Sequence, residues 1–153
     1  MQPLAAQFLT LAKERGIDLQ VVSTYRSPEA QQSLYTSGAG VTNAPALSSY
    51  HNYRLAFDVC PVEYLKLKDW NPEGALWGVI GPIGESVGLT WGGRWAKPDR
   101  PHFQLSAAPI GELRDYWNKF KEIMPISITP TSGGLVMALI VIGAGLWLHK
   151  EYL

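Results

Sequence analysis

The pattern of apolar and polar positions divides the first part of the chain into helical and extended segments. Residues 3–16 carry apolar side chains at the spacing of one helix face and end at a glycine, which predicts a helix. Residues 17–25 are rich in β-branched and aromatic side chains and predict a strand. A Ser-Pro pair, a typical cap and first-turn residue, then predicts a second helix over 28–38.

The pattern continues with short strands and two further helical segments. Strands are predicted at 55–60, 89–93 and 102–105, and an amphipathic helix is predicted at 110–123. Residues 71–88 are apolar and periodic, but two glycines and a proline are expected to break a helix there. Helices beside short antiparallel strands predict an α+β fold, in which a small antiparallel sheet is flanked by helices.

The chain changes character after residue 124. Residues 1–124 are long enough for one folded domain, 125–132 are rich in Pro, Ser and Thr and predict a linker, and 133–150 are apolar up to Leu148. The apolar stretch is just below the roughly 20 residues of a spanning helix, so it predicts a C-terminal transmembrane or membrane-associated helix. The alternative is a buried helix that packs on the domain or forms an oligomer contact.

Composition narrows the function classes. The chain carries 13 Lys and Arg residues and 13 Asp and Glu residues, so its formal net charge is zero. Because a nucleic-acid-binding protein is expected to carry a basic excess or patch, no nucleic-acid partner is predicted. A single cysteine, Cys60, cannot form an intramolecular disulfide and is predicted to pack as a small apolar residue.

Two short segments carry the candidate chemistry. His51 and Asp58 lie in SSYHNYRLAFDVC, and Asp99 and His102 lie in WGGRWAKPDRPHFQ. Two imidazoles and one carboxylate, with a fourth position left for water, are typical of a hydrolytic zinc site. Asp58 interrupts an apolar strand, and binding a cation would remove the cost of burying its charge. Asp99 precedes His102 by three residues and is placed to act as a general base without binding the metal.

Each of these residues also has an ordinary explanation. A single histidine is more often a hydrogen-bonded core or surface residue than a metal ligand. Asp58 could pair with Arg54, and Asp99 could be a turn residue or half of a surface ion pair. Only the combination of the two segments points to zinc.

The order of these motifs carries a family resemblance. Upstream, Arg26 lies in S-x-Y-R-S, and Gln31, Leu34 and Tyr35 lie in Q-x-x-L-Y. The motif S-x-H-x-x-x-x-A-x-D follows, with Ser49, His51, Ala56 and Asp58 at its fixed positions. The segments WGG and D-x-P-H-F come last. This set resembles the VanY-type zinc peptidases, which include D-Ala-D-Ala carboxypeptidases and the L-alanyl-D-glutamate endopeptidases of phage endolysins and bacterial wall remodelling. The resemblance runs from the first helix to about residue 105 and implies a hedgehog/DD-peptidase-like fold.

The resemblance implies a role for each matched residue of the site. His51, Asp58 and His102 correspond to the ligands of one zinc ion per chain. Asp99 corresponds to the carboxylate that activates the attacking water, and Arg26 to an arginine that stabilises an oxyanion or holds a substrate carboxyl group. A guanidinium suits that role because it is always charged and offers forked donors.

Four further residues are predicted to bind substrate: Ser49, Gln31, Trp95 and Arg54. For Ser49 the alternative is local hydrogen bonding in a turn, and for Trp95 it is core packing. Arg54 stands where the family usually has glycine, so it either strains a turn or projects a positive charge toward an anionic stem peptide.

The resemblance therefore predicts a monomeric zinc-dependent peptidase that cuts the peptidoglycan stem peptide, with the L-alanyl-D-glutamate bond as the first choice. The alternatives are a D-Ala-D-Ala carboxypeptidase and a non-catalytic, zinc-containing module that binds the wall. A bacterial or phage origin is expected, with the protein associated with the inner membrane or released to the periplasm or cell wall. The first apolar segment lacks a basic leader, so no N-terminal signal peptide is predicted.

Overall fold

The structure is a computed structural model in two units, Met1–Ser106 and Ala107–Leu153, each of which is described by itself. It describes residues 1–38, 40, 42–66, 74–121, 138–142 and 145–149.

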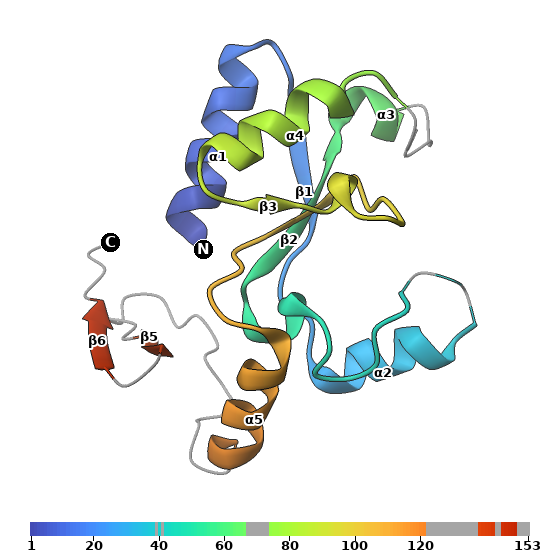
Figure 1. Cartoon of the computed structure of the whole chain (residues 1–153). Helices are drawn as coiled ribbons and strands as arrows, with labels where there is room; N and C mark the ends of the chain where they lie inside the picture. The colour runs from blue at the N-terminus through green and yellow to red at the C-terminus, as the bar shows by residue number, and fades with distance from the viewer. Residues whose placement is uncertain (39, 41, 67–73, 122–137, 143–144, 150–153) are drawn as a thin grey trace, which may run out of the picture. The chain divides into compact units, whose positions relative to one another are not determined.

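The first unit is built around a four-stranded antiparallel sheet with the strand order β1-β2-β4-β3 (Figure 1). Its elements are α1 Gln2–Glu14, β1 Leu19–Ser23, α2 Pro28–Thr36, the 3-10 helix η1 Tyr50–Tyr53, β2 Ala56–Pro61, α3 Val62–Lys66, α4 Trp77–Ser86, β3 Thr90–Trp91, the 3-10 helix η2 Gly92–Arg94 and β4 His102–Gln104. The predicted small antiparallel sheet with flanking helices is therefore confirmed for this unit.

The hydrophobic core lies on one face of the sheet. Phe57 on β2 and Phe103 on β4 are register partners, and the ring of Phe8 from α1 packs against both, with centroids 6.0 and 4.6 Å away. Because successive side chains of a strand point to opposite faces, Asp58 and His102, the neighbours of these phenylalanines, point to the other face. One face of the sheet is thus apolar, and the other carries polar candidate residues.

Helix α4 continues through the residues that were predicted to break it. Pro82 lies inside the helix, so the predicted break is wrong. Packing against the sheet explains the difference: a Cβ at Gly81 would lie 2.2 Å from the ring of Trp91, and one at Gly84 would lie 2.3 Å from the ring of Phe103. The glycines let the helix approach the sheet closely, and this tertiary packing outweighs their weak helix propensity.

The second unit contains α5 Ile110–Phe120 and a separate antiparallel pair, β5 Ala138–Ile142 and β6 Gly145–His149. The predicted amphipathic helix at 110–123 is confirmed as far as Phe120. The predicted apolar helix over 133–150 is wrong where β5 and β6 lie, since a β-branched run such as ALIVI suits a strand as well as a helix. The predicted linker, 125–132, lies outside the described residues.

Among the residues that the structure describes, no helix has both the length and the apolar character needed to cross a bilayer.

Candidate metal centre

Three elements bring the predicted ligands together. Asp58 on β2 and His102 on β4 are direct register partners in the antiparallel sheet. His51 comes from η1, the short 3-10 helix that precedes β2, and its backbone carbonyl accepts a hydrogen bond from Arg26 N at 3.1 Å. Strand pairing therefore sets two of the ligands, and the η1 turn places the third beside them.

The facing atoms of these residues form a small triangle. Asp58 Oδ1 lies 3.2 Å from His51 Nε2 and 3.1 Å from His102 Nδ1, and the two nitrogens are 3.2 Å apart. Bonds of about 2.0–2.1 Å to a tetrahedral zinc place ligand atoms about 3.3–3.4 Å from one another. The observed triangle is close to one face of such a tetrahedron.

Hydrogen bonds behind the triangle fix which ring nitrogen carries the proton. His51 Nδ1 lies 2.6 Å from the backbone carbonyl of Thr24, which can only accept, so Nδ1 is protonated. His102 Nε2 lies 3.0 Å from Gln104 Oε1, and Gln104 is oriented because its Nε2 donates to Ser106 Oγ at 2.9 Å. In the neutral rings, His51 Nε2 and His102 Nδ1 are therefore left with lone pairs that point at Asp58.

While both rings are neutral, two lone pairs and a carboxylate oxygen thus converge with no hydrogen between them. The side chains of His51 and His102 are only 4% and 8% exposed, so water cannot separate the three groups. Burial by itself raises the pKa of Asp58, but when the rings of His102 and His51 carry a second proton, their hydrogen bonds and charge outweigh burial and hold that pKa far below the usual range. Burial lowers the pKa of His102, but hydrogen bonds and charge from Asp58, the hydrogen bond with Gln104 and the charge of Asp99 together outweigh burial and raise that pKa. The site requires a cation, either a proton or a metal ion, and its donors suit a metal ion.

Asp99 lies beside the triangle without belonging to it. Its backbone N–H donates to Gly92 O at 2.9 Å, and its carbonyl accepts from His102 N at 3.2 Å, which closes the turn before β4. The residue is open to solvent, but surrounding protein atoms displace enough water from the carboxyl group to raise its pKa. The charge of His102 opposes this increase, and that of Asp58 adds to it. The structure thus places a second carboxyl group next to the metal-binding set.

Arg26 is held at the site by both its backbone and its side chain. Besides its bond to His51 O, its carbonyl accepts from Asn52 Nδ2 at 2.9 Å, so the residue is tied to η1 on both sides. Its guanidinium donates to Gln31 Oε1 at 2.9 Å and to Ser23 Oγ at 3.3 Å. These contacts orient the guanidinium and leave further N–H donors for a substrate oxygen.

Gln31, which was predicted to bind substrate, has a fully buried side chain. Its Nε2 donates to Ala44 O at 2.7 Å and to Thr42 Oγ1 at 3.1 Å, while its Oε1 accepts from Arg26. Gln31 therefore links two parts of the site: the loop that contains Thr42 and Ala44, and the guanidinium of Arg26. These long-range contacts turn the amide inward.

We expect Gln31→Leu to lower the free energy of unfolding by about 1–3 kcal/mol, because the buried partners of the amide lose their hydrogen bonds. Urea denaturation measures this loss. Gln32→Leu is the matched control on the same helix, since the Gln32 side chain is less buried and accepts one hydrogen bond, from Ala46 N at 3.1 Å. Equal losses in the two variants would contradict the role given to Gln31.

The other predicted substrate residues lie in different settings. Ser49 caps η1: its Oγ accepts from His51 N at 3.3 Å, the local hydrogen bonding that was its alternative interpretation. Trp95 is 39% exposed, and its ring lies 5.1 Å from that of His102. Arg54 has the left-handed conformation expected of the glycine it replaces, with φ of 59°, and its guanidinium stacks on Tyr25 at 4.1 Å.

Sequence reasoning missed the two residues that set the imidazole protons. Thr24 contributes only its backbone carbonyl, for which the side chain gives no signal. Gln104 had a signal, because a polar residue two positions after His102 on a strand shares its face.

Comparison with known proteins finds a family model that matches part of the chain. The model of the peptidase M15 family described as D-alanyl-D-alanine carboxypeptidase matches residues 42–105. Residues 42–105 are therefore similar to this peptidase family and are called the M15 region below. The M15 region includes all three proposed metal ligands and Asp99, and the match confirms the resemblance found in the sequence.

The M15 region also has a curated relative. The peptidoglycan L-alanyl-D-glutamate endopeptidase CwlK of Bacillus subtilis (strain 168) is 32% identical over 111 residues, and the match covers 61% of this chain. The chain spans 64% of the length of that relative.

Two solved structures were also matched to this chain. The L-Ala D-Glu endopeptidase ChiX of Serratia marcescens has a TM-score of 0.51 at 23% identity, covering 76% of this chain and 83% of that one, which indicates a shared fold. The zinc complex of the E175A mutant of the D,D-pentapeptidase VanY from a VanB-type cassette has a TM-score of 0.47 at 14% identity, covering 74% and 75%.

Proposed function

We propose that this chain is a zinc-dependent peptidoglycan peptidase that hydrolyses the L-alanyl-D-glutamate bond of the stem peptide. The observation that carries the proposal is the triangle of His51, Asp58 and His102, with the carboxyl group of Asp99 beside it. The M15 match supports a peptidase, and the name of the Bacillus relative supports the bond. The substrate would place its site of action at the cell wall.

The three ligands would hold one zinc ion per chain, which when bound supplies Lewis acidity to the reacting water and carbonyl group. Asp99 would accept the proton of the attacking water and deliver it to the leaving amine, since its carboxyl group lies next to the three ligands without belonging to them. Arg26 would donate hydrogen bonds to the oxygen that becomes negative, or to a neighbouring carboxylate of the stem peptide.

Arg54, Tyr25 and Trp95 would contact the substrate on either side of the ligands. Arg54 and Tyr25 stack on each other, and Tyr25 adjoins Thr24, whose carbonyl holds His51. Trp95 packs by the other histidine, and its exposed ring suits peptide planes and methyl groups. The cationic side chain of Arg54 matches the carboxylates of an anionic stem peptide.

We expect Arg54→Gly to raise KM several-fold with little change in stability. Glycine relieves about 1 kcal/mol of left-handed backbone strain, while loss of the stacking on Tyr25 costs about 0.5–1 kcal/mol. Steady-state kinetics and thermal unfolding measure the two effects. Arg54→Lys is the control that retains the charge. An unchanged KM in Arg54→Gly would remove Arg54 from the substrate site.

Digestion of purified peptidoglycan, with and without chelator, tests the proposed function. Mass spectrometry should find new amino-terminal D-glutamate in the metal-loaded sample and none with chelator. Release of free D-alanine would instead support a D-Ala-D-Ala carboxypeptidase, the alternative favoured by the description of the family model. Metal binding and wall binding without products would support the non-catalytic module.

A further inference from the structure

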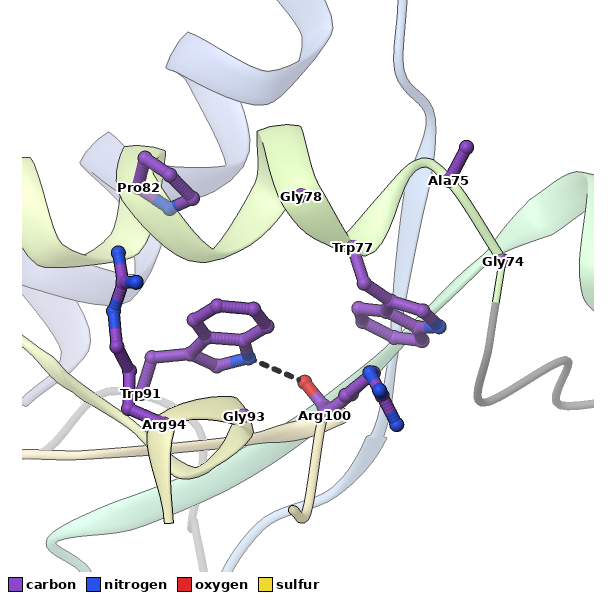
Figure 2. Close-up of a pocket in the computed structure, with 9 residues that line it drawn as sticks. All are labelled: Gly74, Ala75, Trp77, Gly78, Pro82, Trp91, Gly93, Arg94 and Arg100. Carbon is purple, nitrogen blue, oxygen red and sulfur yellow. Dashed lines mark hydrogen bonds between the residues drawn. The ribbon is translucent and has the colours of Figure 1, made fainter.

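The turn from Asp99 to His102 holds the proposed base and one ligand, and it is anchored at three successive residues. The N–H of Asp99 donates to Gly92 O at 2.9 Å, and Pro101 O accepts from Val59 N at 3.0 Å. Between them, Arg100 O accepts a hydrogen bond of 2.8 Å from the indole Nε1 of Trp91, the dashed line in Figure 2. Two of these three hydrogen bonds join backbone groups, and the third is donated by the side chain of Trp91.

The Trp91 ring is held in a fixed position. It is 7% exposed and stacks on Phe103, with centroids 6.4 Å apart and planes 16° apart. A Cβ at Gly81 of α4 or at Gly93 of η2 would lie 2.2 Å from the ring. Figure 2 shows the indole between α4 and Gly93. Contact on these sides leaves the ring little room to shift, so its N–H marks a fixed point for the Arg100 carbonyl.

The carboxylate of Asp99 depends on this anchoring. Within the described part of the chain, no hydrogen bond to that carboxylate is found, so the backbone of the turn determines where it lies. His102 is less dependent, because it is also held by its register with Asp58 and by Gln104.

We propose that Trp91 is a positioning residue, which acts through its indole N–H on the Arg100 carbonyl to fix Asp99 beside the metal ligands. The effect of Trp91 on hydrolysis rests on the proposed function, whereas its effect on the turn does not. Trp91 itself contacts neither the ligand atoms nor, in the proposed mechanism, the substrate.

Removal of the indole N–H is expected to loosen the turn without unfolding the protein. Trp91 and Arg100 both line a pocket of about 460 Å³. Water in this pocket can satisfy the carbonyl that loses its donor, at a small cost in free energy. The variant loses the fixed distance between the ring and the turn, so the Asp99 carboxylate can shift. Displacement of a catalytic group reduces the rate of the reaction by about 10–100-fold.

The test replaces Trp91 site-specifically with 3-benzothienylalanine, which keeps the bicyclic ring shape and puts sulfur in place of N–H. We expect kcat to fall about 10-fold, with KM and zinc affinity within about twofold of native, by steady-state kinetics and chelator competition. Amide hydrogen exchange at Asp99 should be faster in the metal-free variant. The same replacement at Trp77, which is 1% exposed and lines the same pocket, is the matched control and should change none of these quantities.

Native kcat together with native exchange at Asp99 in the Trp91 variant would overturn the inference. A parallel loss of zinc affinity and kcat would also overturn it, because such a loss indicates general damage to the site. If the native chain proves inactive, the proposed function fails. The exchange measurement then still decides whether Trp91 holds the turn, with faster exchange supporting it and native exchange refuting it.

Discussion

Asp99→Asn is expected to lower kcat by about 10²–10⁴-fold while zinc stays bound, because an amide cannot accept the proton of the attacking water. Asparagine has nearly the shape of aspartate, and the backbone bonds of residue 99 to Gly92 and His102 do not involve the side chain. The turn should therefore keep its structure, and the loss should be in proton transfer alone.

Single-turnover hydrolysis of a stem-peptide substrate gives the rate, and metal analysis after dialysis gives the zinc content. Asp18→Asn is the control, since Asp18 is an exposed carboxylate that pairs with Lys13 at 3.4 Å. Undiminished hydrolysis by Asp99→Asn would refute the role of general base. Loss of zinc together with activity would instead make Asp99 part of the metal site.

The ligand set could be predicted from sequence because its signals are local. Asp58 is a charge inside an apolar strand, and His102 opens another strand just after a proline. Neither signal says that the two strands are neighbours. The structure shows that they are, because the antiparallel register pairs Asp58 with His102. In the sequence, only the family resemblance indicated that the two residues come together.

The residues around the ligands were harder to predict because their roles depend on distant contacts. Gln31 and Gln32 are adjacent and identical in type, but only Gln31 turns inward to Thr42 and Ala44. Ser49 was matched to a substrate contact, but its Oγ accepts a hydrogen bond from the N–H of His51, two residues away. Sequence identified which positions matter more reliably than it identified what each side chain touches.

The wrong element predictions have a common physical cause. Helix α4 keeps Pro82 because Gly81 and Gly84 allow close packing on Trp91 and Phe103, a gain that local propensity does not contain. The tail residues 138–142 form a strand within an apolar run that helix and strand fit equally well. In both places the local pattern was ambiguous, and pairing with other segments decided the structure.

Zinc is expected to raise the midpoint of thermal unfolding of the native chain by roughly 10 °C at a free concentration of about 100 times its Kd. An ion that binds only the folded state adds about 2.7 kcal/mol at that concentration, and a domain of this size gains roughly 4 °C for each kcal/mol. The unfolded chain cannot reproduce the triangle, because its corners come from separate elements, η1, β2 and β4. Scanning calorimetry at fixed pH measures the shift.

Asp58→Asn and Asp99→Asn form a matched pair for this measurement. Asp58→Asn replaces the only anionic donor of the described triangle by a neutral amide, so most of the zinc-induced shift should disappear. Asp99→Asn makes the same chemical change next to the triangle and should keep the shift. A full shift in Asp58→Asn, or none in the native chain, would contradict the proposed ligands. Because binding and hydrolysis are measured separately, the pair separates the residue that holds the metal from the one that moves the proton.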